Sequence, residues 1–203
     1  MNRYIIILGI CSLFVLSLAM FSCVKPCLEA DHDFSVSESF LPEKDSIRIG
    51  DSLFITCIIP KIEKDRYTQV IINFSGANNI GDHLVISDIS KFNTQRDASD
   101  SFSYFKIQGN IYSDQYGVKQ LSFAEIDTAY QLQVGLIAQK RGLYIFTIPD
   151  MPGVYRNGQA KCGRGNFQIL NANVNKHLYL FENLWGPIIS PYDAAHSYCV
   201  KVK

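Results

Sequence analysis

The sequence has no excess of charge of either sign. Its 203 residues include 19 Lys and Arg against 19 Asp and Glu, so the formal net charge at pH 7 is zero. Proteins that bind nucleic acids or anionic membrane surfaces usually concentrate positive charge, which neutralises the phosphates. The composition therefore predicts no nucleic-acid partner and no overall basic face for an anionic membrane.

The sequence also lacks the common signatures of catalytic and cofactor sites. It contains no G-x-S-x-G, no H-E-x-x-H, no P-loop and no G-x-G-x-x-G after a strand. Its histidines are few: His32, His83, His177 and His196. Their spacing from Cys162 and Cys199 matches no standard zinc pattern. We therefore expect no enzyme, no cofactor and no metal site, and a hydrolase whose carboxylates meet only in the fold stays an alternative.

The one long apolar run lies at the N-terminus. Arg3 precedes an uncharged stretch of 18 residues from Tyr4 to Phe21, which Ser22 and Cys23 follow. A positive charge, an apolar core and a small residue before the cleavage point are typical of an export signal. The run is at the lower limit for a membrane-spanning helix, so an uncleaved anchor stays open, as does an ordinary secretory signal.

The residues around this cleavage point resemble a bacterial lipobox. In Met20-Phe21-Ser22-Cys23 a small residue precedes the cysteine, and Met20 stands where the pattern usually has Leu. The resemblance implies cleavage between Ser22 and Cys23 and acylation of Cys23. More than one acyl chain gives stable attachment to a lipid bilayer.

The chain then divides into three parts. Residues 1–22 are the expected signal peptide, residues 23–33 a lipidated tether and residues 34–203 one folded domain. In the tether, Glu29 and the nearby Asp31 and Asp33 resemble the acidic residues that direct some lipoproteins to the cell surface, and a solvated linker is the alternative. We expect a place in the cell envelope, on the periplasmic or the surface face of the outer membrane.

Four cysteines follow Cys23, in a compartment that favours disulfides. They are Cys27, Cys57, Cys162 and Cys199. Cys57 shares a strand face with apolar residues, so it should point into the core, where a free thiol behaves as a small hydrophobe. Cys199 shares a face with Lys201 and should point outward. A disulfide from Cys162 to Cys199 or to Cys27 is therefore expected.

The rest of the chain predicts short strands separated by turns. Residues 130–138 are the clearest strand. Apolar side chains stand there at every second position, so one face of the strand is buried and the other is mostly exposed. This period of two is typical of an antiparallel sheet. Further candidate strands are residues 34–40, 52–59, 67–74, 83–89, 102–108, 111–113, 143–148, 167–170 and 197–202. Residues 140–142 look like a hairpin turn between two of these strands.

Helical signal is sparse. Ser190 followed by Pro191 is typical of a helix start, and one or two turns could follow. Residues 122–125 have the spacing of a capping box without an apolar period behind it. Residues 177–185 fit a strand or a short helix equally well.

Residues 142–146, which read Gly-Leu-Tyr-Ile-Phe, resemble the G-x-Y-x-F stretch of immunoglobulin-like domains. In that family the Tyr packs at a corner and bonds a nearby backbone group. Residues 50–53 are similar to the start of such a domain's second strand. The resemblance implies an all-β fold, an antiparallel immunoglobulin-like β-sandwich with one or two short helical turns. The layout as a whole resembles small lipoproteins of outer-membrane bacteria. This resemblance implies a location in the cell envelope and implies no particular activity.

We therefore hypothesise a non-enzymatic module, attached to the lipid bilayer, that binds or scaffolds another envelope component, an unknown protein or glycan. The alternative is a module that binds a glycan or small ligand on an aromatic platform, for which ordinary packing is the competing interpretation. The aromatic residues concerned are Tyr112, Tyr116, Tyr155, Trp185 and Tyr192.

Three short segments resemble the D-[ST]-apolar acceptor for O-glycosylation in some of these bacteria. The acceptor residues would be Ser46, Ser52 and Thr128, each directly after an Asp. Because Asp-Ser is also a normal turn pair, an unmodified turn is the alternative interpretation.

Overall fold

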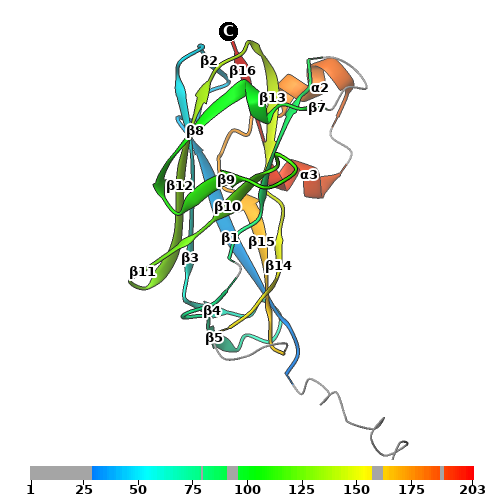
Figure 1. Ribbon diagram of the computed structural model, residues 1–203. Coiled ribbons are helices and arrows are strands. Elements are labelled where there is room, and N and C mark those ends of the chain that lie inside the picture. The colour runs from blue at the N-terminus through cyan, green and yellow to red at the C-terminus, as the bar shows by residue number, and fades with distance from the viewer. Residues whose placement is uncertain (1–28, 79, 91–95, 157–161, 188–189) are drawn as a thin grey trace, which may run out of the picture.

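The computed structural model describes residues 29–78, 80–90, 96–156, 162–187 and 190–203. In these residues the chain forms two seven-stranded sheets and a two-stranded ribbon, with two α-helices at one side of the sandwich (Figure 1). The expected signal peptide, Cys23 and Cys27 lie outside the described residues. Of the helices within them, none has the length and apolar character needed to cross a membrane.

The first sheet has the strand order β11-β12-β3-β1-β15-β14, and β8 also pairs with β12. Its strands are β1 (His32–Leu41), β3 (Ser52–Pro60), β8 (Phe102–Gln108), β11 (Ala124–Ile126), β12 (Ala129–Ala138), β14 (Met151–Val154) and β15 (Gly165–Asn171).

The second sheet has the order β2-β16-β13-β6-β10-β9, and β7 pairs with β6. Its strands are β2 (Ser46–Ile47), β6 (His83–Asp88), β7 (Arg96–Asp97), β9 (Asn110–Ser113), β10 (Lys119–Ser122), β13 (Gly142–Thr147) and β16 (Ser197–Val202). The remaining elements are the ribbon of β4 (Ile62–Lys64) and β5 (Ile71–Asn73), a 3₁₀ turn (Ser99–Ser101), α2 (Tyr179–Trp185) and α3 (Pro191–His196).

The all-β sandwich expected from the sequence is confirmed, but the sheets are not wholly antiparallel. β1 pairs in parallel with β15, with Phe34 opposite Phe167, and β2 pairs in parallel with β16. Parallel neighbours need a long connection, and here most of the domain separates the two strands of each pair. Because β3 occupies one edge of β1, β15 adds to the other edge.

The turn at residues 140–142 joins the two sheets, so the prediction of a hairpin there is wrong. The edges of β12 are taken by β3 on one side and by β8 and β11 on the other, whereas β13 pairs with β6 and β16. Tyr144 closes this crossing, since its hydroxyl lies 3.1 Å from the Lys140 carbonyl oxygen and 3.3 Å from that of Arg141. The corner tyrosine implied by the immunoglobulin-like resemblance is thus present.

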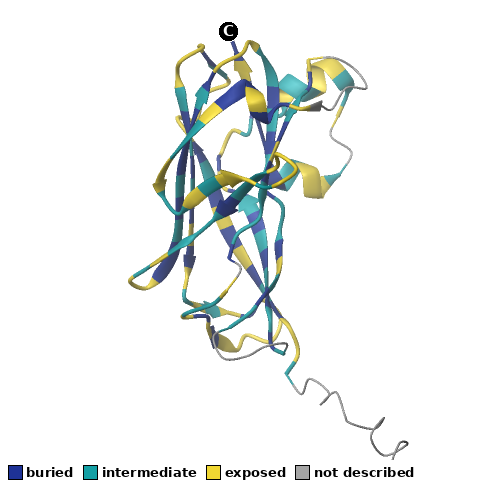
Figure 2. Ribbon diagram, in the orientation of Figure 1, coloured by how far each residue is buried: buried dark blue, intermediate teal, exposed yellow. Residues whose placement is uncertain are grey.

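The core lies between the inner faces of the two sheets (Figure 2). Alternate residues of β12 point into it, as the sequence predicted: Tyr130, Leu132, Val134, Leu136 and Ala138 are all buried. Cys57 is also buried there and is a free thiol, as expected. Because successive side chains of a strand point to opposite faces, every second side chain enters the core.

Two other segments differ from the sequence-based expectation. Residues 65–70 form a turn and only Ile71–Asn73 is a strand, so Val70 is exposed while Ile72 is buried. The Asp65 carboxylate accepts hydrogen bonds from the Tyr67 and Thr68 amides, which stabilises the turn over an extended strand. The capping-box spacing at residues 122–125 starts no helix, because the segment belongs to β10 and β11.

Helix α2 lies beside β16 of the second sheet, whereas α3 contacts β15 of the first sheet. Residues 177–185, which fitted strand or helix, contain α2, and α3 begins at Pro191 as predicted. The Ser190 hydroxyl caps α3 by accepting the Asp193 amide at 3.4 Å. The last strand, β16, also has its expected bounds.

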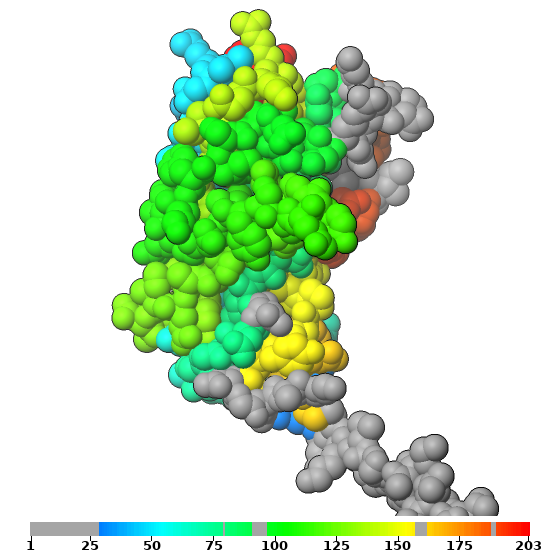
Figure 3. Space-filling view, in the orientation of Figure 1, coloured from blue at the N-terminus to red at the C-terminus, as the bar shows by residue number. Residues whose placement is uncertain are grey.

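The sandwich has two distinct ends. The chain enters the described part beside the β4–β5 ribbon at one end, and the C-terminus and α2 lie at the opposite end (Figure 1). The space-filling view shows the same separation, with the blue N-terminal atoms at the narrow lower end (Figure 3). We call the lower end the tether end and the other the distal end.

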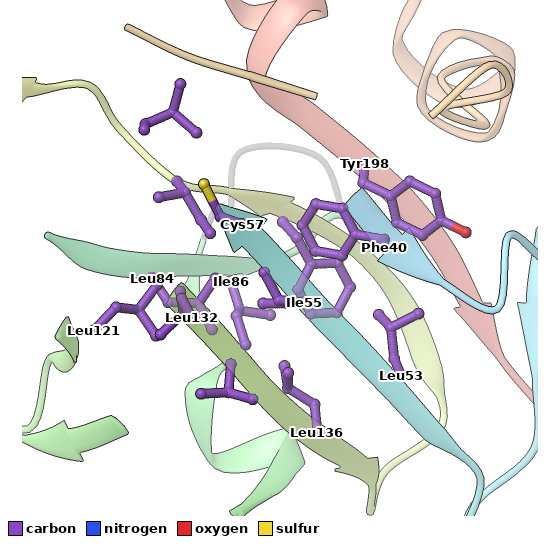
Figure 4. Close-up of a cluster of buried hydrophobic side chains, with 14 of the residues drawn as sticks. Phe40, Leu53, Ile55, Cys57, Leu84, Ile86, Leu121, Leu132, Leu136 and Tyr198 are labelled. Atoms are coloured by element: carbon purple, nitrogen blue, oxygen red, sulfur yellow. The ribbon is translucent and has the colours of Figure 1, made fainter. Parts of the chain in front are cut away.

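Strands from both sheets meet in the core through stacked rings. Phe40 of β1 and Tyr198 of β16 stack with ring centroids 4.7 Å apart and planes 4° apart (Figure 4). The Tyr198 hydroxyl reaches past the core to the Lys44 backbone, donating to its carbonyl oxygen and accepting from its amide, each at 3.0 Å. A buried ring with a bonded hydroxyl tip both packs and fixes the relative position of two elements.

Candidate functional site

Helix α2 is held against the distal end of the second sheet at both of its ends. At its start the Tyr179 hydroxyl donates to the Asp45 carboxylate at 2.6 Å, and this bond lowers the pKa of Asp45. At its end the Trp185 indole nitrogen donates to the Ile89 carbonyl oxygen at 2.9 Å. The helix is therefore fixed in position although it is only seven residues long.

A groove of about 750 Å³ lies between α2 and the distal ends of β13 and β16. Its apolar lining comes from Leu143 of β13 and from Leu180 and Leu184 of α2. Leu184 is 49% exposed, which is high for a side chain of this type. We call this feature the distal groove.

Basic side chains form the other part of the lining. Arg141, Lys201 and Lys203 border the groove, and all three are exposed. None of the described residues that line it is acidic. An apolar floor with cations on one side suits a ligand that combines apolar side chains with negative charge.

Cys199 lies beneath the segment that leads to α2. The prediction that Cys199 points outward and forms a disulfide is therefore wrong. Cys199 does lie on the outer face of β16, but its amide donates to the Lys176 carbonyl oxygen at 2.9 Å and the thiol is free and fully buried. Burial raises the pKa of Cys199 to about 12. The sequence showed the face of the strand, but not the segment that covers it.

Cys162 is half-buried and is disulfide-bonded, and neither Cys57 nor Cys199 is its partner because both are free. Of the two partners that the sequence suggested, only Cys27 remains, and it lies outside the described residues. The pairing of Cys27 with Cys162 stays a prediction.

The tether joins the domain through a network of charged groups. Arg164 binds Asp31 with its side chain and its amide, Arg156 pairs with Glu29, and His32 lies between Glu29 and Asp65. These bonds lower the pKa of Glu29 and Asp31. The two acidic residues are thus bound to the domain, so residues 29–33 differ from a solvated linker, while residues 23–28 lie outside the described residues. The strand β1 begins at His32, two residues before the expected start.

The five aromatic residues of the glycan-binding alternative lie on separate elements. Tyr112 is on β9, Tyr116 in the following turn, Tyr155 after β14, and Trp185 and Tyr192 on the two helices. Tyr192 stacks on His196 with centroids 3.8 Å apart. Tyr112 lines a polar hollow of about 410 Å³ together with Gln120 and Glu125. The five rings therefore provide no single platform, although one of them borders a polar hollow.

Two buried clusters contain titratable side chains of the kinds that serve as nucleophiles or as acids and bases in enzymes. In the first, Glu38 of β1 is fully buried opposite Cys57, and neither of its carboxyl oxygens has a hydrogen-bond partner among the described residues. Burial raises the pKa of Glu38 to about 8 and that of Cys57 to about 12, while Lys176 opposes the shift of Glu38. Both groups therefore hold their protons at neutral pH, which removes the thiolate or carboxylate that a nucleophile would require.

The second cluster surrounds His196, which is fully buried at the end of α3. Its Nε2 lies 3.0 Å from the Asp150 carboxylate and its Nδ1 2.6 Å from the Tyr192 carbonyl oxygen. Both ring nitrogens face oxygen atoms of the protein, so neither is directed at a nucleophile. In the part of the chain that the structure describes, no group of three His, Cys, Asp or Glu side chains could hold a metal ion.

The three predicted glycosylation acceptors differ in access. Thr128 is exposed in the turn between β11 and β12, while Ser46 in β2 and Ser52 in β3 are half-buried. Their modification stays a prediction, as does acylation at Cys23 after Ser22, which the described residues do not include.

The comparisons with known proteins complete this description. No known family matches the sequence, and no curated protein is significantly similar to it. Among solved structures, a chain in the crystal structure of a type I cohesin–dockerin complex from Clostridium thermocellum is similar, with 15% identity and a TM-score of 0.21. The similarity covers 66% of this chain and 99% of that chain, and it concerns the β-rich fold alone.

Proposed function

We propose that this chain is an envelope lipoprotein that presents a non-enzymatic binding site at its distal end. In this proposal Cys23 carries the acyl chains, the sandwich acts as a rigid spacer, and the distal groove binds another envelope protein. No catalytic step is assigned, because the buried thiols and Glu38 are protonated and His196 is occupied by Asp150 and a backbone oxygen.

One observation carries the proposal: the tether and the distal groove lie at opposite ends of the sandwich (Figure 1). The ion pairs of Asp31 and Glu29 hold the described base of the tether against this end of the domain. A bilayer at the tether end would therefore leave the groove facing away from the membrane. The groove also combines apolar side chains with three cations, which suits a partner that carries apolar and acidic groups.

A site-specific crosslink in native membranes tests the binding role. A photo-reactive amino acid replaces Leu184 in the groove or, as a matched control, Tyr116, which is 82% exposed and lies in the turn between β9 and β10. We expect a discrete protein adduct from position 184 alone, and its loss when Lys201→Glu and Arg141→Glu reverse the charge of the groove. Equal adducts from both positions, or an adduct insensitive to the charge reversal, would contradict the proposal.

A glycan ligand is the second candidate, and the polar hollow beside Tyr112 favours it. A ring that is 49% exposed next to Gln120 and Glu125 offers stacking and hydrogen bonds to a sugar. A glycan array probed with the mature protein and with Tyr112→Ala tests this: binding that the substitution abolishes supports it, and binding that the substitution leaves intact removes the hollow as the site.

A further inference from the structure

Apolar side chains are exposed on the β4–β5 ribbon at the tether end. Tyr67 is 71% exposed, Val70 51%, Ile71 69% and Ile62 60%. In the ribbon Lys64 pairs with Ile71, and Ile62 pairs with Asn73, so both isoleucines lie on its outward face. Four large apolar side chains exposed on one short hairpin form a patch of the kind that marks an interaction surface.

The turn of this ribbon is joined directly to the base of the tether. The Asp65 carboxylate, which is buried, accepts the Asp33 amide at 3.0 Å, and the Arg66 amide donates to the Asp33 carbonyl oxygen at 2.8 Å. Asp65 also holds the turn itself, through the amides of Tyr67 and Thr68. The exposed apolar side chains therefore sit where the chain leaves the domain.

The length of the tether limits how far this end can lie from an anchor at Cys23. Six peptide units separate Cys23 from Glu29, which Arg156 binds to the domain. An extended residue spans about 3.5 Å, so the docked part of the tether lies within about 20 Å of the acylated residue. A spacer of this length keeps the ribbon near the headgroups.

The charges around the ribbon match an anionic lipid surface. Lys64 and Arg66 are exposed beside the apolar side chains, and the Arg66 guanidinium lies 5.7 Å from the centre of the Tyr67 ring. The nearby acids are engaged by the domain: Asp31 and Glu29 pair with arginines, and Asp65 accepts hydrogen bonds from backbone amides. Glu63 of β4 is half-buried and pairs with Ile72 on the opposite face of the ribbon. Long basic side chains and tyrosine are the residues that proteins place at the headgroup level of a bilayer.

We propose that the β4–β5 ribbon lies in the headgroup region of the bilayer to which Cys23 is attached, so that the domain touches the membrane as well as being tethered to it. This inference rests on the lipid attachment of the proposed function. It adds a second contact, which holds the sandwich upright and the distal groove away from the lipid surface.

Tryptophan quenching tests the contact in the natively acylated protein. Tyr67→Trp and the control Tyr116→Trp are each made in a Trp185→Phe background and reconstituted into phosphatidylethanolamine and phosphatidylglycerol vesicles, with or without brominated acyl chains. We expect the emission of Trp at position 67 to shift to the blue and to fall to roughly half with brominated lipid, because an interfacial ring lies about 5–10 Å deep. The control should not respond.

Three other outcomes would overturn the inference, and they are distinguishable. Equal emission at both positions in a protein whose intact mass shows the acyl chains would remove the ribbon contact and leave the lipid attachment standing. An intact mass without acyl chains would remove the attachment itself and with it the reason for placing the ribbon on lipid. A blue shift without quenching, growing with the number of copies per vesicle, would mean that a second copy of the chain covers the ribbon.

Discussion

Arg164 binds Asp31 through two of its guanidinium nitrogens: Nη2 lies 2.6 Å from Oδ2, and Nε lies 3.2 Å from both carboxylate oxygens. The Arg164 amide donates to the same carboxylate at 3.1 Å. One residue of the tether is thus bound to the segment just before β15. This pair places Asp31 at the end of the domain opposite the distal groove, and the separation of tether and groove depends on that placement.

Breaking this pair should loosen the tether without unfolding the domain. Both side chains are about a third or more exposed, so Arg164→Gln should lower the free energy of unfolding only slightly. We expect the backbone amide of His32, which donates to the Arg164 carbonyl oxygen, to exchange with solvent faster by less than about fivefold. Hydrogen exchange measured by NMR checks this.

The matched control is Lys61→Gln, which breaks the 2.8 Å ion pair of Lys61 with Glu125 instead. It should leave exchange at His32 unchanged. The role given to Arg164 would be wrong if the two variants affected His32 equally.

Glu38 should make the protein less stable as the pH rises. Its pKa is raised by burial from 4.5 to about 8, so the folded state holds the proton more tightly than the unfolded state does. The stability is complete below about pH 4.5 and is lost as the pH rises through the folded pKa near 8. The loss has an upper bound of about 5 kcal/mol, since each pH unit corresponds to about 1.4 kcal/mol.

Glu38→Gln removes this ionisation and keeps the shape of the side chain. We expect urea unfolding to show that the variant gains stability relative to the parent protein between pH 5 and pH 8. Parallel stability curves for the two proteins over this range would show that Glu38 does not remain protonated in the core.

Tyr144→Phe should weaken the crossing between the sheets. The substitution removes the hydroxyl that bonds the backbone at Lys140 and Arg141 and leaves the ring in the core. The expected cost is about 0.5–1.5 kcal/mol, which is the usual net contribution of one intramolecular hydrogen bond. Thermal unfolding measures it, and the control Tyr116→Phe, on an exposed ring, should change stability by less than about 0.5 kcal/mol. An equal effect of both changes would contradict the corner role.

The cysteines should divide into two classes. Cys57 and Cys199 are buried thiols whose pKa burial raises to about 12, so iodoacetamide should leave both unmodified until the protein is unfolded in urea. A non-reducing peptide map should show Cys162 linked to Cys27. A peptide joining Cys162 to Cys199 would contradict both the free thiol and the covering of β16 by the segment at Lys176.

The sequence predicts those features that depend on local patterns. Alternation identified β12, and the G-x-Y-x-F stretch identified the corner at Tyr144, because each signal lies within a few neighbouring residues. The crossing at residues 140–142 was mistaken for a hairpin because the choice depends on which strands occupy the edges of β12, and those strands are distant in sequence. The parallel pairing of β1 with β15 was missed for the same reason.

The candidate site was harder to predict than the fold. The distal groove needs Leu143 and Leu184 side by side, which are 41 residues apart and share no motif. The docking of Asp31 on Arg164 gave no sequence signal either, since both residues read as parts of solvated segments. For the basic residues Lys201 and Lys203, the sequence indicated only that they lie on the solvent-exposed face of the last strand.

The most direct test of the account is the intact mass of the mature protein purified from its native membranes. We expect the mass of residues 23–203 with a diacylglycerol on the sulfur of Cys23 and a further acyl chain on its amino group. A chain that still carries residues 1–22, or one whose Cys23 is unmodified, would contradict the lipid attachment on which the placement of the groove depends.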